Sequence, residues 1–411
     1  MKKIVIIGGG PAGLKAALNA AERYKGKAEI TLIEKNERCG RKLMITGKGR
    51  CNVTNNCDLD TLIANVPKNG RFLYSAFSSF LPQDTMAYFE SAGVPLKTER
   101  GNRVFPLSDK AVDIVDALVK GLRPLGIKQL HATAKSIKTA GEKVIGVELE
   151  KGQVVDADSV VLATGGMSYP VTGSTGDGYR MAEALGHTVT ELRPSLVPLN
   201  CHEGFCSRLA GLSLKNVTLS VFAGEKKKPI FKEMGEMLFT HFGISGPLVL
   251  SASAYLRKMG KAEYKVVIDL KPALTVEQLD KRILRDFENE KNKDFANSLD
   301  ALLPKSIIPV IIEKSGINPR EKVNQVSREQ RMDLCRAIKE FTLNITGFRP
   351  IEEAIITSGG ISVKEINPST MESKLIKGLF FAGEIIDVDA FTGGFNLQIA
   401  FSTAFLAGEN V

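Results

Sequence analysis

Residues 3–34, KIVIIGGGPAGLKAALNAAERYKGKAEITLIE, contain the clearest structural pattern in the chain. The apolar run Ile4–Ile7 predicts a buried strand, which leads directly into a turn over Gly8–Gly13 with the spacing GxGxxG. A helical window over Leu14–Tyr24 and a second apolar run over Ile30–Ile33 follow. This order of strand, glycine turn, helix and strand predicts a βαβ unit in a parallel α/β sheet.

Each glycine of this turn has its own physical role. Gly8 permits the tight turn, Gly10 lets the backbone approach a pyrophosphate, and Gly13 allows close packing of helix on sheet. Pro11 and Ala12 open the helix, whose first N–H groups are free to bind phosphates. We therefore predict that these five residues form one end of a dinucleotide site.

Glu34 closes the second strand, about 20 residues after the last glycine, where a carboxylate accepts hydrogen bonds from ribose hydroxyls. A glycine turn without a ligand is the alternative interpretation of such a fingerprint. The flanking strand and helix, together with the acid, favour the bound dinucleotide.

The composition is that of an ordinary globular protein. The chain has 411 residues, 43% hydrophobic and 25% charged, which is enough for two or three domains. The formal net charge of +9 suits a polyanionic partner and equally a basic cofactor groove. No apolar stretch approaches the roughly 18 residues that a membrane helix needs, and six sparse cysteines predict no disulfides. We expect a cytoplasmic protein without a membrane partner.

The predicted secondary structure changes along the chain. Short apolar runs first alternate with helical windows, and residues 134–157 predict a small antiparallel meander. Capping boxes at Thr275 and Ser327 predict the starts of helices, and an apolar helix is expected at 398–407. We therefore expect an α/β domain over 1–190 and 350–411, a β-rich inserted domain over 191–273 and 340–349, and a helical subdomain over 274–339.

Two further glycine-containing segments follow. Residues 160–166 read VVLATGG, and residues 378–398 read GLFFAGEIIDVDAFTGGFNLQ. With the first turn, they resemble the two-dinucleotide-binding-domain flavoproteins, in which the ATG strand passes beside the FAD. The first turn alone would fit NAD as well, but a terminal Gly-Glu turn followed by a helix is typical of the flavin version. The resemblance implies a Rossmann-like, glutathione-reductase-type FAD-binding domain.

The same resemblance implies FAD contacts in both segments. Glu384 takes the place usually held by Asp and would accept a hydrogen bond from the ribityl chain. The N-terminus of the last helix would face the flavin, and its free N–H groups near residues 396–398 would stabilise the reduced ring. The implied contacts are Ala163, Thr164, Gly165, Gly166, Gly383, Glu384, Gly394, Asn396, Leu397 and Gln398.

Four longer stretches give a closer resemblance. They are CGRKLMITGKGRCNVTN (39–55), RVFPLSDKAVDIVDAL (103–118), ATGGMSYPVTGSTGDGY (163–179) and GEMLFTHFGISGP (235–247). Together they are similar to the BaiN/YhiN-like family of NAD(P)/FAD-dependent oxidoreductases, over essentially the whole chain. The family architecture implies a β-barrel-like subdomain and a helical subdomain inserted within the FAD domain.

Basic residues follow the second strand. Lys35, Arg41, Lys42, Lys48 and Arg50 lie in or before a glycine-spaced loop that could meet a phosphate or the flavin ring and favour an anionic reduced flavin. We predict that the first three of them bind the cofactor. A solvated loop is the alternative.

The sequence identifies no catalytic residue with certainty. His241, within LFTHFGISGP, is a candidate proton donor, and a packing histidine is the other interpretation. The four histidines form no ligand cluster, so no metal site is predicted. Cys201 and Cys206 have a C-x4-C spacing, which we interpret as two buried residues because the redox pair of flavin disulfide reductases follows the first βαβ unit.

These observations predict an FAD-dependent oxidoreductase that transfers hydride between the flavin and an organic substrate. NAD(P)H would be a transient reductant, because only one complete GxGxxG unit is present. The family implies reduction of a conjugated C=C bond in a small molecule. Two alternatives stay open: an RNA-modifying flavoenzyme that reduces a pyrimidine base, which the net charge would suit, and a flavin-binding sensor or scaffold without turnover.

Overall fold

The computed structural model describes residues 1–411, except for the side chain of Lys48. The prediction for Lys48 in the basic loop therefore lies outside the described side chains. Contacts divide the chain into two compact units, 1–195 with 350–411 and 196–349. Each unit has its own hydrophobic core.

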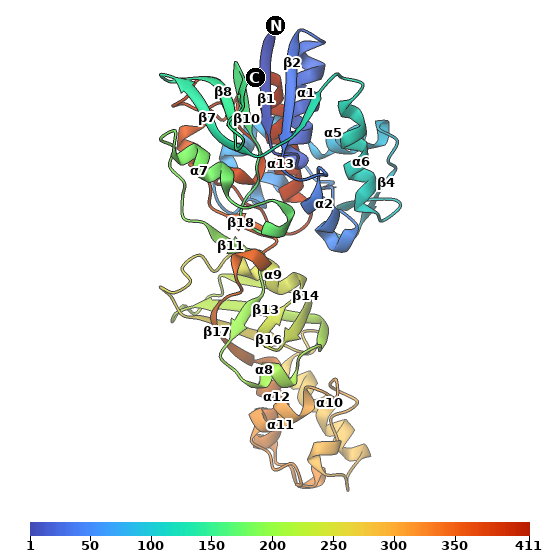
Figure 1. The fold of residues 1–411 in the computed structure, drawn as a ribbon. Coiled ribbons are helices and arrows are strands. Elements are labelled where there is room, and N and C mark those ends of the chain that lie inside the picture. The colour runs from blue at the N-terminus through green and yellow to red at the C-terminus, as the bar shows by residue number, and fades with distance from the viewer. The chain divides into compact units, whose positions relative to one another are not determined.

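The first unit is built on a five-stranded parallel sheet with the order β19-β10-β1-β2-β6 (Figure 1). The central strand β1 (Lys2–Ile7) pairs with β2 (Ala28–Glu34) on one side and with β10 (Ser159–Leu162) on the other. The edge strands are β19 (Leu379–Phe381) and β6 (Lys128–His131). Strands β10 and β19 and most of β1 are apolar and buried, as expected of a parallel sheet covered on both faces, whereas the edge strand β6, KQLH, is polar and mostly exposed. Both ends of the chain thus build one Rossmann-like fold, as predicted.

Two helices pack against each other beside this sheet. Helix α1 (Pro11–Tyr24) connects β1 with β2, and α13 (Phe395–Asn410) packs along it. A Cβ atom added to Gly408 would lie 2.9 Å from the carbonyl oxygen of Ala16, so glycine is needed for this close approach. Helix α13 starts three residues before the expected 398–407 and ends three residues after it. Its first turn, Phe-Asn-Leu, does not show the apolar period that marks the rest.

The remaining elements of the first unit flank the sheet. The predicted meander is present as β7 (Ala134–Ala140), β8 (Lys143–Leu149) and β9 (Val154–Asp156). A second small sheet has the order β3-β5-β4, with β3 (Thr54–Asn55), β4 (Leu96–Glu99) and β5 (Arg103–Pro106). The helices are α2 (Arg41–Ile45), α3 (Leu59–Ala64), α4 (Tyr74–Ser79), α5 (Pro82–Ser91), α6 (Ala111–Leu122) and α7 (Asp177–Glu183).

The second unit contains a closed six-stranded antiparallel barrel with the order β12-β15-β14-β13-β16-β17. Its strands are β12 (Leu199–Cys201), β13 (Ser213–Ala223), β14 (Phe231–Thr240), β15 (Gly243–Ser245), β16 (Tyr264–Asp269) and β17 (Phe341–Phe348). Two short helices, α8 (Phe205–Arg208) and α9 (Pro247–Ser253), accompany it. Leu219, Phe239 and Val266 are fully buried in its core, so the β-barrel-like insertion predicted from the family is confirmed.

Residues between β16 and β17 form the helices α10 (Val276–Asn289), α11 (Ile308–Ser315) and α12 (Arg328–Lys339). The side chains of Thr275 and Ser327 accept hydrogen bonds from the backbone of Gln278 and Gln330, so both predicted capping boxes are confirmed. The division of this unit into a barrel domain and a helical subdomain at 274–339 stays a prediction.

By contacts the second unit begins at residue 196, five residues after the expected start of the insertion at 191, and the domain bounds stay a prediction. Strand β11 (Arg193–Ser195) pairs with β18 (Ile356–Ser358), and both belong to the first unit. Residues 193–195 therefore form a strand of the first unit.

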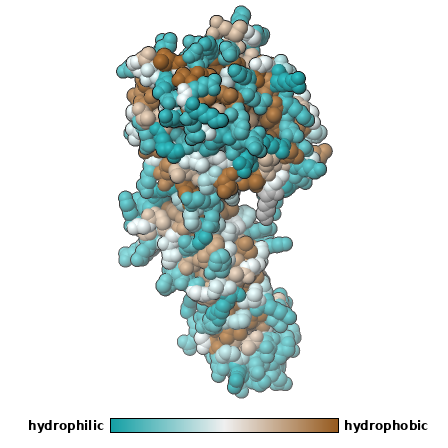
Figure 2. All heavy atoms as spheres, in the orientation of Figure 1, coloured by the Kyte–Doolittle hydropathy of each residue, from teal (hydrophilic) through white to brown (hydrophobic). Residues whose placement is uncertain are grey.

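No helix among the residues that the structure describes is long and apolar enough to cross a membrane. Hydrophilic residues cover most of the face seen in Figure 2, and the apolar residues on it form small patches. Such scattered apolar groups are normal on a protein surface.

Lys15 is an unusual residue of the first core, because its side chain is buried without a carboxylate partner at ion-pair distance among the described residues. It is 3% exposed, and its Nζ lies 4.1 Å from the ring centroid of Tyr88 and 4.5 Å from that of Phe80. Burial lowers the pKa of Lys15 from 10.5 to about 8. The aromatic faces compensate only part of the desolvation of the ammonium group.

This burial predicts a pH-dependent stability. Between pH about 8 and 10.5 the unfolded chain binds more protons at Lys15 than the folded one, so stability should rise with pH in this window. Lys15→Met should remove a gain on the order of 3 kcal/mol. Thermal midpoints of the wild type and the variant measured from pH 7 to pH 10 test this, with exposed Lys27→Met as the control. Parallel profiles for wild type and Lys15→Met would contradict it.

Candidate functional site

The candidate site lies at the carboxyl edge of the parallel sheet. The strands β1, β2, β10 and β19 all run in one direction, so their carboxyl ends meet at one edge. Gly8, Lys35, Ala163 and Ala382 are the first residues after these four ends. Ligands of open parallel sheets bind at this edge, so the topology brings the three predicted segments together.

Two glycines of the first turn are required by the protein itself. Gly8 has a φ of +107°, and a Cβ atom on it would lie 2.5 Å from the carbonyl oxygen of Ala163. A Cβ atom on Gly13 would lie 1.8 Å from the carbonyl oxygen of Gly8. Neither position has room for a side chain, so the close approach of β1, β10 and helix α1 requires glycine at both positions.

Gly10 differs from both. Its φ of −78° and ψ of −177° suit any residue, and a Cβ atom on it would have no described protein atom within 4 Å. It directly precedes Pro11, the first residue of α1. The space beside Gly10 is therefore free of described protein atoms. A pyrophosphate is expected to approach the backbone at this position.

The three motifs contact one another in a closed triangle. Gly8 of the first lies against Ala163 of the second, as described above. A Cβ atom on Gly166 of the second would lie 2.7 Å from Oε1 of Glu384, and one on Gly383 would lie 2.8 Å from Cβ of Ala12. Segments more than 370 positions apart therefore share one site.

Glu34 is held beside the first turn. Its Oε2 accepts a hydrogen bond from the N–H of Gly9 at 2.6 Å, and its Oε1 accepts two from Asn36, from the N–H and from Nδ2, each at 2.7 Å. The carboxylate is therefore fixed next to the glycine turn with acceptor capacity left over.

The Lys42–Glu384 ion pair joins the basic loop to the C-terminal segment. Lys42 Nζ donates to Glu384 Oε2 at 2.9 Å and to Ser168 Oγ at 2.7 Å, and the two charged side chains are 19% and 17% exposed. Glu384 Oε1 also accepts from the N–H of Thr357 at 2.8 Å. The structure thus brings two predicted site residues into direct contact.

The other cations of the loop also have partners. Lys35 Nζ lies 2.5 Å from Asp177, and Arg50 lies 2.6 Å from Asp109. Burial would raise the pKa of Asp177, but hydrogen bonds from Lys35 and Thr175 outweigh burial and lower it. Arg41 donates to Asn36 at 2.8 Å and is exposed. Lys35, Lys42 and Arg50 are therefore each paired with an acid, and the binding of the cofactor by Lys35, Arg41 and Lys42 stays a prediction.

The start of α13 is shaped by Gly394 and Asn396. Gly394 has a φ of +99°, and a Cβ atom on it would lie 2.4 Å from the carbonyl group of Thr54. Asn396 holds the preceding loop, since its side chain accepts from the N–H of Ala390 and donates to the carbonyl of the same residue, each at 2.8 Å. Leu397 is partly buried.

Gln398 requires a correction, because it was expected among the residues with free N–H groups. Its N–H donates to the carbonyl of Gly394 at 3.1 Å, so the groups that precede the first intrahelical bond are those of 395–397. Its buried side chain accepts from Thr54 at 2.6 Å and Thr85 at 2.8 Å and donates to the carbonyl of Phe80. Gln398 therefore anchors α13 in the core.

The segment 51–55 was not assigned to the site from the sequence. Asn55 Nδ2 donates to the carbonyl of Gly393 at 3.0 Å, which places this segment beside the start of α13. Cys51 has a φ of +60° and is fully buried, and burial raises the pKa of its thiol to about 12. Asn52 Oδ1 and Thr164 Oγ1 are buried without a hydrogen-bond partner among the described residues. Both atoms therefore have hydrogen-bonding capacity left for a ligand or a water. The signal for Asn52 in the sequence was the motif GKGRCNVTN.

His241 belongs to the second unit, in the turn between β14 and β15, where it is exposed and its ring meets that of Phe242 edge-on at 5.0 Å. Its role as a proton donor stays a prediction. Cys201 and Cys206 are free thiols of the same unit, and a hydrogen bond between them raises the pKa of Cys201. No group of three or more His, Cys, Asp or Glu residues in the described part of the chain could hold a metal ion.

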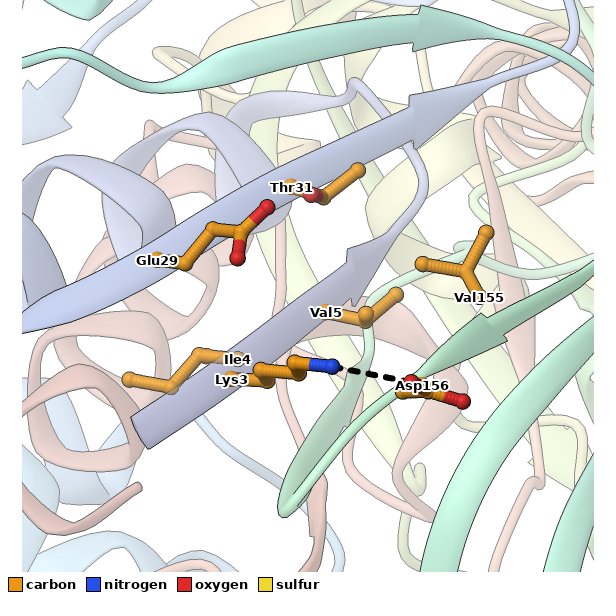
Figure 3. Close-up of a pocket in the computed structure, with 7 residues that line it drawn as sticks. All are labelled: Lys3, Ile4, Val5, Glu29, Thr31, Val155 and Asp156. Atoms are coloured by element: carbon orange, nitrogen blue, oxygen red, sulfur yellow. Dashed lines mark hydrogen bonds and ion pairs between the residues drawn. The ribbon is translucent and has the colours of Figure 1, made fainter. Parts of the chain in front are cut away.

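A shallow pocket of about 90 Å³ lies elsewhere on the first unit and is lined by Lys3, Val5, Glu29 and Asp156, among others (Figure 3). The Lys3 ammonium group points to Asp156, at 2.8 Å. These residues lie toward the amino ends of β1 and β2, away from the glycine turn that follows β1. The pocket is therefore separate from the candidate site.

A parallel sheet with these three segments at its carboxyl edge defines a dinucleotide-binding flavoprotein fold. The structure of 3-ketosteroid delta1-dehydrogenase from Sterolibacterium denitrificans has this fold, with a TM-score of 0.53, 14% sequence identity and coverage of 99% of both chains. The model of the HI0933-like protein Rossmann domain matches residues 2–410, and the chain belongs to this family. It is a family of flavin oxidoreductases, and family and fold together imply FAD binding.

Two curated relatives match along their whole length. The 3-dehydro-bile acid delta(4,6)-reductase of Clostridium scindens is 32% identical over 413 residues, which cover 100% of this chain and 98% of that protein. The ribosomal RNA dihydrouridine synthase of Haemophilus influenzae is 32% identical over 416 residues, which cover 99% of this chain and 98% of that protein. The resemblance stated from the motifs is therefore confirmed at the level of the family.

The contrast between Gly10 and Gly13 predicts two different outcomes. Gly10→Ala should fold with a stability within about 0.5 kcal/mol of the wild type, but its methyl group should weaken cofactor retention. Gly13→Ala should lose roughly 1 to 3 kcal/mol of stability from the clash with the carbonyl of Gly8. The thermal midpoints of the flavin-free proteins and the flavin-to-protein absorbance ratio after purification measure both effects. Full flavin retention by Gly10→Ala would show that the open position serves no ligand.

Proposed function

We propose that this protein is an FAD-dependent oxidoreductase that reduces a C=C bond conjugated to a carbonyl group. The observation that carries the proposal is the contact of all three motifs at the carboxyl edge of the sheet, with Gly10 open and Asn52 and Thr164 lacking partners. The donors and acceptors at this edge fit a dinucleotide, because a carboxylate stands where a ribose is expected and free N–H groups stand where phosphates are expected.

Each part of the cofactor has a proposed partner. Glu34 would accept from the adenosine ribose, and the N–H groups at the start of α1 would bind the pyrophosphate next to Gly10. Glu384 has one acceptor position left beside its three hydrogen bonds, which a ribityl hydroxyl can fill. Residues 163–166, between Gly8 and Glu384, would line the cofactor.

FAD when bound supplies the transfer of hydride, and the protein supplies binding, orientation and charge. The N–H groups of 395–397 would receive the edge of the flavin that becomes negative on reduction. A helix N-terminus is worth on the order of 0.3 to 2 kcal/mol to such a charge. Because Lys35, Lys42 and Arg50 are paired with acids, we assign this stabilisation to α13 and not to the basic loop.

NAD(P)H is the proposed reductant. The chain has one complete strand, glycine turn and helix unit with its acid, so a pyridine nucleotide would visit the flavin transiently and weakly. His241 remains our candidate for the proton donor. The free thiols fit a reducing compartment, and we place the activity in the cytoplasm.

The relatives support the substrate chemistry. One is named as a reductase of a bile acid and the other as a dihydrouridine synthase acting on ribosomal RNA. The C5=C6 bond of uracil is conjugated to a carbonyl, so one chemistry, hydride addition to an activated alkene, covers both kinds of substrate. A flavin-binding sensor without turnover is the competing function.

The identity of the flavin and the substrate class can be tested together. Denaturation and chromatography should release FAD and not FMN, since the turn and Glu34 address a pyrophosphate and a second ribose. Protein reduced under anaerobic conditions should be reoxidised by a conjugated enone or by uridine in RNA, and far more slowly by an isolated alkene. Release of FMN would refute the assignment of FAD as the cofactor. A flavin that NAD(P)H does not reduce and that no alkene reoxidises would favour the sensor function.

Glu384 provides a separate test. Glu384→Ala should weaken FAD retention and leave the buried Lys42 ammonium group unpaired, at a cost of roughly 1 to 3 kcal/mol. Glu384→Gln keeps an acceptor and should retain more flavin than the alanine variant. Flavin occupancy and thermal midpoint are compared with those of Glu352→Ala, which changes an exposed glutamate. Equal flavin affinity in all four proteins would remove the C-terminal turn from the site.

A further inference from the structure

The positive charge of the protein is concentrated in the second unit. Residues 196–349 contain 25 Lys and Arg against 18 Asp and Glu, a net charge of +7 out of the total of +9. The larger first unit contains 30 basic and 28 acidic residues. The excess therefore belongs to the second unit, whereas the residues of the cofactor edge belong to the first.

Most cations of the helical part are neutralised by nearby acids. Eight ion pairs join eight of the 13 basic residues of 274–339 to carboxylates at 3.7 Å or less. The same range contains 11 acidic residues, so its net charge is only +2. The pairs are Arg282–Asp286, Arg285–Asp286, Lys291–Glu288, Lys293–Glu290, Lys322–Asp294, Arg331–Asp280, Arg336–Asp333 and Lys339–Asp269.

The barrel carries a different set of lysines, all of them exposed. None of them forms an ion pair with any residue that the structure describes. The acids in the same strands and loops are Glu225, Glu233, Glu236, Glu263 and Asp269, and the last of these is paired with Lys339. We call this set the barrel lysine patch. It consists of Lys226, Lys227, Lys228, Lys232, Lys258, Lys261 and Lys265.

The strand register gathers the patch at one end of the barrel. Lys232 on β14 lies opposite Ser220 of β13, and Lys265 on β16 lies opposite Phe222 of β13. Ser220 and Phe222 share one face of β13, so both lysines project from the same outer face, on strands about 10 Å apart.

The turn that carries Lys226–Lys228 and the loop that carries Lys258 and Lys261 complete the patch. The first directly follows β13 and the second directly precedes β16, and these strand ends are paired, Ala223 with Tyr264. The N–H of Gly224 donates to the carbonyl of Glu263 at 2.9 Å, which joins the turn to the loop. All seven lysines therefore lie on or next to one end of the outer barrel wall.

Partly exposed apolar groups lie among these lysines. Phe222 stands between the two lysine-bearing strands, and Met234, two residues beyond Lys232, is 62% exposed. A patch that mixes lysines with an aromatic ring suits a nucleic acid, because the ammonium groups can bind phosphates while the ring can stack on a base.

We propose that the barrel lysine patch is the docking surface for an RNA substrate. The inference rests on the proposed function, since the base to be reduced must present a conjugated C=C bond, which uracil does. A small apolar substrate has no use for seven unpaired lysines, whereas every phosphate of an RNA backbone offers one negative charge. Charge complementarity thus assigns RNA to this surface.

The test measures binding of a fluorescein-labelled, unmodified RNA stem-loop to the full-length holoprotein by anisotropy, between about 50 and 200 mM salt. Replacing Lys226, Lys227, Lys228 and Lys232 by Gln should weaken binding by roughly tenfold or more and reduce the slope of log Kd against log salt by about 3. A control variant with Lys291, Lys293, Lys322 and Arg336 changed to Gln loses the same net charge at paired sites. The Kd of this control variant should change much less than the Kd of the patch variant.

Three results would overturn the proposal. They are no binding of wild type to the stem-loop at low salt, equal loss of affinity in both variants, and tighter binding to vesicles containing phosphatidylserine than to RNA. FAD content and thermal midpoint of both variants establish that each is folded. The reoxidation assay with enones is independent of this surface, so its failure would count against the proposed chemistry and leave RNA docking intact.

Discussion

The closeness of helix α1 to the end of strand β1 is the constraint on which the rest of the first unit depends. The carbonyl of Gly8 stands so near the Cα of Gly13 that no side chain fits between them, and Gly8 in turn lies against the strand end at Ala163. This approach sets the start of α1, and with it the direction of the N–H groups that we assign to a pyrophosphate. Gly10 differs from both, because the packing of the protein does not require glycine at this position.

The edge formed in this way is held from the other end of the chain by charge. Lys42 and Glu384 are both largely buried and satisfy each other, with Ser168 and Thr357 completing the hydrogen bonds of the carboxylate. A buried ion pair of this kind adds little net stability, but loss of one partner is costly. It therefore fixes the C-terminal turn against the second motif and the basic loop, and it neutralises the charge of Lys42.

The sequence predicted those features that local physics determines. The glycine spacing, the buried strands and the two capping boxes each depend on residues within a few positions of one another, and all were found as expected. The pairing of Lys42 with Glu384 and the hydrogen bonds of the buried Gln398 side chain join residues more than 300 positions apart. A local sequence pattern cannot predict such contacts. The start of α13 was missed because its boundary is set by the positive φ of Gly394 against Thr54 and not by apolar periodicity.

The way the second unit joins the first bears on how the chain folds. The two connecting strands are paired on both sides of the junction, Ser195 with Ile356 in the first unit and Leu199 with Phe348 in the second. Once the barrel has formed, residues 196–349 act as a short closed connection instead of a long flexible loop. Early folding of residues 196–349 shortens the flexible connection between β10 and β19, which lowers the entropic cost of pairing these strands by on the order of 1 kcal/mol. Early folding of the insertion would thus speed the slow, long-range parallel pairing that completes the cofactor domain.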